Sequence, residues 1–237
     1  VYLTANILPH NDDIEEFEEF VKDIKNYGFD AVLVADLGLF DMMQELAPDI
    51  PIHVSTQANN INYRSAIKWY KMGATRVVLA REMSFKEIAE FQKKIPEDLE
   101  LEAFIHGAMC ISYSGRCLLS NYMTGRDSNM GACAHPCRWN YKLVEETRPG
   151  EYMDVFENER GTFIFNSKDL CTIRHIPELV KSGIASLKIE GRVKTSYYVA
   201  TVVGAYRREI DRYCADPENY VSVSYTHLRA HETEADL

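Results

Sequence analysis

Four of the six cysteines lie close together in the sequence, and thiols in such a group can bind metal. Cys110, Cys117, Cys133 and Cys137 have the spacing C-x6-C-x15-C-x3-C. Structural zinc sites usually pair cysteines two to four residues apart, and only the last two come near that spacing. Iron–sulfur clusters take four thiolates with freer spacing, because the ligands come from separate loops. The pattern alone leaves a cluster, a zinc site and buried unliganded thiols open.

The other two cysteines, Cys171 and Cys214, fall in segments with helical periodicity. A free cysteine in such a segment most often behaves as a small hydrophobic residue. Cys171 also follows the expected end of a strand, so it is a reserve ligand that would replace Cys137 if the x3 spacing is too tight. The first residues lack the order of a signal peptide, so thiols, metal ligands or redox groups are better interpretations than a disulfide framework.

Alternating strands and helices must position these residues. Short β-branched or apolar runs alternate with helical-period segments at intervals of about 25 residues, which is typical of βα units around a parallel sheet. We expect strands at 1–5, 31–35, 52–55, 76–80, 99–105, 162–165 and 185–189. We expect helices near 12–27, 38–47, 60–72, 84–94 and 195–213. The predicted class is α/β, an incomplete TIM-like β/α barrel with a cysteine-rich insertion at 106–140; a doubly wound open sheet has the same alternation.

Polar residues follow the ends of these strands, at the edge where β/α barrels build their sites. They are Asn6, Asp36, Gln57, Arg81, His106, Asn166, Lys168, Glu190 and Arg192. From this edge we predict Gln57, Arg81, His106 and Lys168 as substrate-binding residues, with Arg116 added from the cysteine segment. Lys168 is placed to bind an anion at a helix N-terminus, where backbone N–H groups are free.

The KIEGR stretch supplies the predicted catalytic residues. Alternation along a strand puts Lys188 and Glu190 on one face, and Arg192 follows at the strand end, so a cation and a carboxylate would meet at the barrel mouth. An arginine there suits bidentate binding of a carboxylate or an RNA phosphate. A structural ion pair is the alternative.

Arginines and aromatic residues accompany the cysteines. Arg116, Arg126 and Arg138 would stabilise an anionic cluster or hold a substrate phosphate, and surface solvation is the alternative for each. Trp139 and Tyr141 are placed to stack on a splayed base of single-stranded RNA, although such aromatics are more often core residues.

Composition excludes several function classes. The net charge of −10 argues against nucleic-acid binding over the whole surface, although 168–212 is locally basic. No apolar run approaches the roughly 18 residues of a membrane span, so we expect a cytoplasmic protein without a membrane partner. The chain has no dinucleotide fingerprint, P-loop, zinc-protease helix or G-x-S-x-G elbow. A thiol-protease dyad of His106 and Cys110 is conceivable only if that cysteine does not bind iron.

The sequence resembles the collagenase-like peptidase family U-32. The resemblance is carried by LEAFIHGAMCISYSGRCLLSNY, GACAHPCRW, FNSKDL and SLKIEGRVKTSYYVATVVGAYRREID, and it extends over nearly all of 1–220. It implies a prephenate-dependent hydroxylation of the wobble uridine of tRNA, with relatives that act on ribosomal RNA or on quinone precursors. It also implies a [4Fe–4S] cluster on Cys110, Cys117, Cys133 and Cys137, an RNA substrate and a small carboxylate co-substrate.

Two further readings accompany this resemblance. One is a collagenase-like peptidase of unassigned mechanism, and the other is a non-catalytic cluster-binding subunit that works with a homologous barrel partner. The family pattern begins with two βα units that this sequence lacks, so we expect 1–222 to be a truncated barrel domain. We expect 223–237 to be a non-native tail, because VSYTHLRAHET has no periodicity and resembles a translated sequencing adapter, and we exclude its histidines as ligands.

Overall fold

Two compact units divide the chain. A computed structural model describes residues 1–110, 112–114, 116–139, 141–143, 146–147, 149–150, 152–154, 157–158, 161–162, 169–192 and 194–222. Unit 1 comprises Val1–Ile50, Gln57–Asn59 and Met109–Lys168. Unit 2 comprises Pro51–Thr56, Asn60–Ala108 and Asp169–Leu237. No helix among the described residues is long and apolar enough to cross a membrane.

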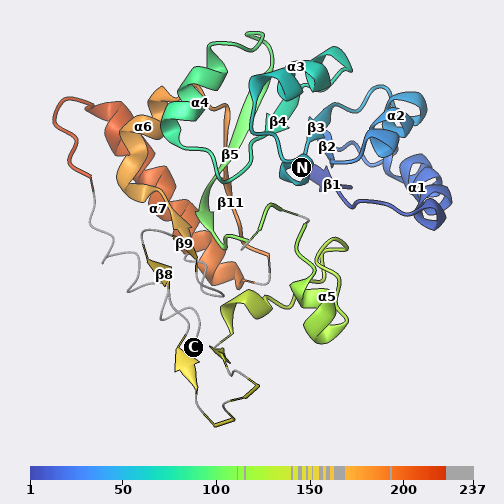
Figure 1. The fold of residues 1–237 in the computed structure, drawn as a ribbon. Helices are drawn as coiled ribbons and strands as arrows, with labels where there is room; N and C mark the ends of the chain where they lie inside the picture. Colours follow the sequence, from blue (N-terminus) through green and yellow to red (C-terminus); the bar gives the residue numbers. More distant parts are fainter. Residues whose placement is uncertain are drawn as a thin grey trace. The chain divides into compact units, whose positions relative to one another are not determined.

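Unit 1 begins with two strand–helix repeats (Figure 1). Strand β1 (Tyr2–Thr4) pairs in parallel with the fully buried β2 (Ala31–Val34), and helix α1 (Asn11–Ile24) connects them. Helix α2 (Leu37–Leu46) follows β2 and starts at a side-chain cap, because the Asp36 carboxylate accepts hydrogen bonds from the backbone N–H groups of Gly38 and Leu39. Such a cap satisfies amides that have no partner inside the helix.

The cysteine-rich segment, defined as 109–143, also lies in unit 1 and has little regular structure. It contains the short helix α5 (Leu119–Thr124), the 3-10 turn η2 (Pro136–Arg138) and β6 (Lys142–Leu143). Strand β6 pairs antiparallel with β7 (Met153–Asp154), and β8 (Glu157–Asn158) pairs antiparallel with β9 (Gly161–Thr162). The turn η1 (Thr56–Ala58) follows β3 of unit 2.

Unit 2 is centred on a long strand. Strands β3 (Ile52–Val54), β4 (Arg76–Val78) and β5 (Glu100–Gly107) are parallel neighbours in chain order. Strand β11 (Ser186–Ile189) pairs in parallel with β5, and the two-residue β10 (Leu170–Cys171) pairs antiparallel with the end of β5. The helical segments are α3 (Tyr63–Lys71), α4 (Phe85–Gln92), η3 (Ile173–His175), α6 (Ile176–Lys181) and α7 (Ser196–Ala215).

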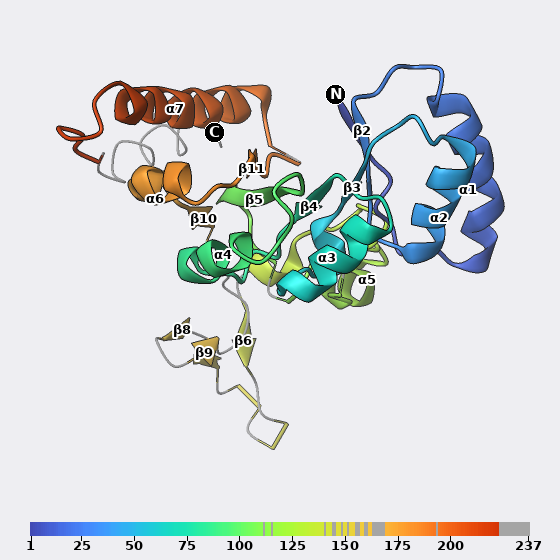
Figure 2. The ribbon, with the colours of Figure 1, turned by 90° about the horizontal axis from the view of Figure 1, so that it is seen from above.

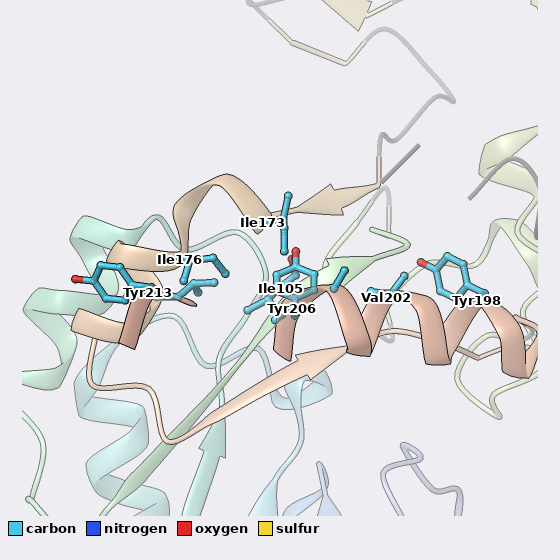
Figure 3. Close-up of a cluster of buried hydrophobic side chains, with 9 residues drawn as sticks. Ile105, Ile173, Ile176, Tyr198, Val202, Tyr206 and Tyr213 are labelled. Atoms are coloured by element: carbon cyan, nitrogen blue, oxygen red, sulfur yellow. The ribbon is translucent and has the colours of Figure 1, made fainter. Parts of the chain in front are cut away.

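One face of β5 and β11 packs against helices to form a core. Ile105 of β5 lies with Ile173, Ile176 and Leu179 and with residues of α7 in one buried cluster (Figure 3). From α7 the cluster takes Tyr198, Val202, Ala205, Tyr206 and Tyr213, and Figure 2 shows α7 and α6 beside this part of the sheet. Burial of these aliphatic and aromatic side chains fixes α7 against the sheet, since apolar burial is the main favourable contribution to folding.

Both units are built of the strand–helix repeats of TIM-like β/α barrels, which confirms the predicted α/β class. The strands expected near 1–5, 31–35, 52–55, 76–80, 99–105 and 185–189 are present with small shifts at their ends. Cys171 was expected in a helical segment and lies instead in β10, where a two-residue strand is too short to leave a periodic signal. Of the strand expected at 162–165, only Thr162 lies within the described residues, in β9.

Candidate functional site

The four cysteines of the 110–137 block all lie in unit 1. Cys137 is buried, Cys117 and Cys133 are partly exposed, and Cys110 is exposed. Burial raises the pKa of the Cys137 thiol, the Arg138 guanidinium opposes that rise, and the other three cysteines each raise the pKa further.

Hydrogen bonds hold the loops between these cysteines in place. The Ser128 hydroxyl donates to the carbonyl oxygen of Cys117 at 2.6 Å, and the Ala134 N–H donates to the Ser120 hydroxyl at 2.9 Å. The Arg138 guanidinium donates to the carbonyl oxygen of Met109 at 3.1 Å. The side chain that follows Cys137 thereby reaches the residue that precedes Cys110.

Asn129 attaches the same segment to the loop after β1. Its amide oxygen accepts from the Leu8 N–H at 2.9 Å, and its amide nitrogen donates to the Leu8 carbonyl at 3.0 Å. The Asn129 N–H donates in turn to the Asp127 carboxylate at 2.8 Å. A side-chain amide that pairs with both backbone groups of one residue fixes a loop much as a strand neighbour does.

The donor set fits a metal–thiolate group. The backbone N–H of His135 donates to the Cys133 sulfur at 3.4 Å, and His135 adopts a positive φ of 54°, which directs the turn. An amide donor to sulfur and a neighbouring guanidinium each favour a thiolate, the form in which cysteine binds metal, although burial and the other cysteines keep the pKa of Cys137 raised. Among the described residues, no three His, Cys, Asp or Glu side chains lie close enough together to hold one metal ion. A cluster differs from such a site in distributing its thiolates over several irons.

A second polar group lies at the strand ends of unit 2. Arg81 follows β4 and is nine-tenths buried; its guanidinium contacts the Glu190 carboxylate at 3.4 Å and donates to the Ala108 carbonyl. The backbone N–H of Arg192 donates to the other Glu190 oxygen at 2.7 Å. Gly107 makes this approach possible, because a Cβ there would stand 2.6 Å from the Glu190 carbonyl oxygen. Glu190 is thus fixed at the carboxyl ends of the strands.

Lys188 belongs to a different set of contacts from Glu190. Its ammonium lies 2.9 Å from the Glu102 carboxylate, which also accepts from the Ser186 hydroxyl at 2.8 Å and pairs with Arg76 at 3.3 Å. Burial opposes ionisation of Glu102, but these partners outweigh it, so the carboxyl pKa is lowered. The carboxylate that meets Lys188 is therefore Glu102.

An aromatic ring separates the two sets. The Arg81 guanidinium stacks 3.8 Å from the centroid of Phe104, and the Lys188 ammonium lies 5.4 Å from the same centroid. Phe104 and Lys188 are register partners in the β5–β11 pair. Cations over a ring face gain electrostatic attraction, so Phe104 helps to order both side chains.

His53 of β3 lies against the Glu102 set. Its pKa is lowered to about 4, mainly by burial and also by the nearby Arg76 and Lys188 cations, while Glu102 and Glu100 act in the opposite direction. The imidazole is consequently neutral at pH 7 and serves this cationic set as a polar, uncharged neighbour.

The other predicted substrate-binding residues are dispersed. Gln57 is buried in η1, and Arg116 is exposed beside Cys117. His106 is buried, with its Nδ1 3.4 Å from the Tyr206 hydroxyl and its ring edge-on to the tyrosine ring. Lys168 lies outside the described residues. Among the described residues that were predicted for the site, Glu190 contacts both the Arg81 guanidinium and the backbone N–H of Arg192.

Sequence reasoning missed Glu102, Phe104 and His53 as parts of the polar network. The available signal was the LEAFIH strand, in which Glu102 alternates with Leu101 and Ala103 inside a buried run. A charged residue on the inward face of a strand requires a partner. Its partners Arg76 and Lys188 are distant in sequence, so register alone identifies them.

The comparisons with known proteins agree on one family. The model of peptidase family U32 matches residues 1–235. The chain belongs to peptidase family U32. It is 46% identical over 221 residues to tRNA hydroxylation protein P1 of Bacillus subtilis, covering 93% of this chain and 52% of that protein. It is 41% identical to tRNA hydroxylation protein P of Escherichia coli, covering 89% of this chain and 55% of that protein.

Another relative carries a different kind of name. An uncharacterized protease of Methanocaldococcus jannaschii is 43% identical over 214 residues, covering 89% of this chain and 51% of that protein. The chain spans about half the length of these curated relatives. The resemblance predicted from the cysteine and KIEGR blocks is confirmed at the level of the family.

Proposed function

We propose that this U32 chain is part of an iron–sulfur protein that hydroxylates the wobble uridine of tRNA, with prephenate as co-substrate. The [4Fe–4S] cluster would be held by Cys110, Cys117, Cys133 and Cys137. The observation that carries the proposal is the four-cysteine block itself, whose two ends are joined by the hydrogen bond from the Arg138 guanidinium to the Met109 carbonyl oxygen. Similarity to tRNA hydroxylation proteins supports the choice of reaction and substrate.

The chemistry explains why a cluster suits this role. Hydroxylation of a ring inserts an oxygen atom and removes two electrons from the ring, work that side chains cannot do alone. A bound cluster would relay electrons, and an oxygen-donating co-substrate would have to supply the oxygen atom and accept the two electrons. The remaining tasks, which are to bind the RNA, to orient the small carboxylate and to exclude water, belong to the residues of the chain.

The strand-end group is proposed as the site of the small carboxylate. Arg192 is exposed at this edge, and its guanidinium matches a carboxylate in bidentate geometry. Glu190 fixes the loop that carries Arg192 by accepting the Arg192 N–H. Arg81 in turn fixes Glu190. Lys188 would act on this group through Phe104, since its own carboxylate partner is Glu102.

The experiment uses the full-length parent in a strain that lacks its own copy. Total tRNA is digested to nucleosides, and hydroxylated uridine is measured by mass spectrometry. Cys117→Ala should abolish the product, whereas Cys214→Ala, which removes an exposed cysteine of α7, should leave it unchanged. Arg192→Lys should raise the prephenate concentration needed for half-maximal product. Product at the wild-type level in Cys117→Ala would contradict the proposal.

A peptidase function is the second candidate, favoured by the relative named as a protease. It would need a thiol and a base, and the pair considered from sequence was His106 and Cys110. His106 is engaged with Tyr206, while Cys110 contributes to the environment of Cys137. Cleavage of collagen-like peptides by purified iron-free protein, abolished by Cys110→Ala, would support this candidate.

A third candidate is a cluster-binding subunit that works only with a homologous barrel partner. Co-purification of a second barrel protein, with hydroxylated product formed only when both are present, would support it.

A further inference from the structure

The cysteine-rich segment 109–143 differs from the rest of the chain in charge. It contains four cationic side chains and one carboxylate, a net charge of +3, within a chain whose net charge is −10. The cations are Arg116, Arg126, Arg138 and Lys142. A local excess of cations in an acidic protein is the electrostatic footprint of a polyanion site, because phosphate contacts require clustered lysine and arginine.

Two of these arginines are available to a ligand. Arg116 and Arg126 are both exposed, and neither guanidinium pairs with any residue that the structure describes. Arg138, in contrast, is used structurally by its hydrogen bond to the Met109 carbonyl. The segment therefore separates a cation that holds the cysteine loops from cations that face solvent.

The same segment exposes aromatic rings. Trp139 is 43% exposed, Tyr113 is 44% exposed and Tyr122 on α5 is 85% exposed. Exposure of large rings is costly in water, and in a segment that also carries exposed cations it is typical of surfaces that stack nucleobases.

Trp139 is held ready for a planar ligand. Its ring is stacked with that of Tyr141, with centroids 6.5 Å apart and planes tilted by 22°. The Tyr141 hydroxyl donates to the Pro136 carbonyl at 2.8 Å, which fixes the pair to the turn η2 that carries Cys137. A base stacked on the outer face of Trp139 would thus lie two residues from one of the four clustered thiols.

We propose that the Trp139–Tyr141 pair is a stacking platform for an unpaired base of single-stranded RNA, with Arg116 and Arg126 contacting the flanking phosphates. The inference deepens the proposed function and rests on it for the class of substrate. The RNA loop would then bind directly to the cysteine-rich segment. Double-stranded RNA would bind weakly there, because its bases are stacked on one another and offer no free face.

The test measures RNA binding by the 237-residue chain and needs no catalysis. A labelled RNA hairpin with an unpaired loop, and the fully paired duplex of the same length, are titrated with protein while fluorescence anisotropy is followed. Trp139→Ala should bind the hairpin about 5- to 150-fold more weakly, the range for loss of one stacked base, with little change for the duplex. Tyr27→Ala, which removes another exposed ring of unit 1, should bind as the wild type does.

The phosphate contacts have their own signature. In Arg126→Gln, the slope of the logarithm of the binding constant against that of the salt concentration should fall by about 0.7, the value for one phosphate contact on a single strand. Arg64→Gln, a change to an exposed arginine of α3, should leave the slope unaltered. Circular dichroism of every variant checks that the chain remains folded.

Two outcomes would overturn the platform. One is equal hairpin affinity in the wild type and in Trp139→Ala. The other is Trp139-dependent self-association in sedimentation runs without any effect on RNA, which would make the rings an interface between copies. Failure of the proposed function appears separately, as protein without iron or tRNA without product, and neither readout is needed here.

Discussion

At the scale of single residues, Glu102 is a buried charge with three side-chain partners. Its side chain is 4% exposed and holds Lys188, Arg76 and Ser186. We expect Glu102→Gln to lower the free energy of unfolding by about 3–5 kcal/mol, because two cations then lose a buried partner. Urea unfolding followed by circular dichroism measures it. Glu90→Gln, which breaks the exposed pair with Lys93, should change stability by about 0–1 kcal/mol, and equal losses in both variants would refute the ranking.

The histidine beside this network predicts a pH dependence. The pKa of His53 is about 4 in the folded chain, compared with 6.5 for an unperturbed histidine. The unfolded state therefore binds more protons, and stability should decrease as pH falls from about 6.5 to about 4, by at most about 1.4 kcal/mol per pH unit for one proton. Glu102, with its lowered pKa, adds a loss at still lower pH.

The measurement is the urea midpoint across that pH window. His53→Gln should flatten the dependence, since the side chain no longer titrates, whereas His175→Gln removes a histidine from the η3 turn and should retain it. A wild-type chain whose stability is constant from pH 6.5 to 4 would be inconsistent with a buried neutral His53.

At the scale of elements, the end of β5 depends on a glycine. Gly107 has a φ of 106°, and an added Cβ would stand 2.8 Å from the Cβ of Glu190 as well as against its carbonyl oxygen. We expect Gly107→Ala to cost about 2–5 kcal/mol through backbone strain and overpacking. Gly204→Ala is the matched control, because Gly204 lies in α7 with open space around it and should gain about 0.5–1 kcal/mol. Thermal unfolding of both variants compares the signs.

The cysteine-rich segment has an equivalent attachment at Asn129. Asn129→Ala removes both hydrogen bonds to the Leu8 backbone, which we expect to cost about 1–3 kcal/mol and to speed the loss of iron to a chelator. Asn121→Ala, at an exposed position of α5, should do neither. Iron release at the same rate in the two variants would show that this attachment does not hold the segment.

The elements also show what sequence reasoning captures. Apolar periodicity placed β2, β5 and α7 within a few residues, because burial on one face or both leaves a strong local pattern. Cys171 was misplaced because β10 derives its order from pairing with His106 rather than from its own two residues. The separation of Lys188 from Glu190 was equally invisible, since the register shift after Lys188 and the partner Glu102 are both tertiary features.

At the scale of the whole molecule, the strand repeats and the cysteine-rich segment have different tasks. The strand repeats of unit 2 carry Arg81, Glu190 and Arg192 at strand ends, where β/α proteins place their chemistry. The cysteine-rich segment is poor in regular structure and rich in hydrogen bonds between loops. Such a segment gains stability from a bound metal group, because ligand binding to the folded state adds to the free energy of unfolding.

The proposed [4Fe–4S] cluster can be tested by measuring its iron and sulfide. Iron, acid-labile sulfide and the optical spectrum are determined for anaerobically purified full-length parent protein, for Cys117→Ala and for Cys214→Ala. We expect about four irons and four sulfides per chain, with a brown charge-transfer absorption that Cys117→Ala loses and Cys214→Ala retains. Colourless, iron-free protein, or iron bound undiminished in Cys117→Ala, would contradict it.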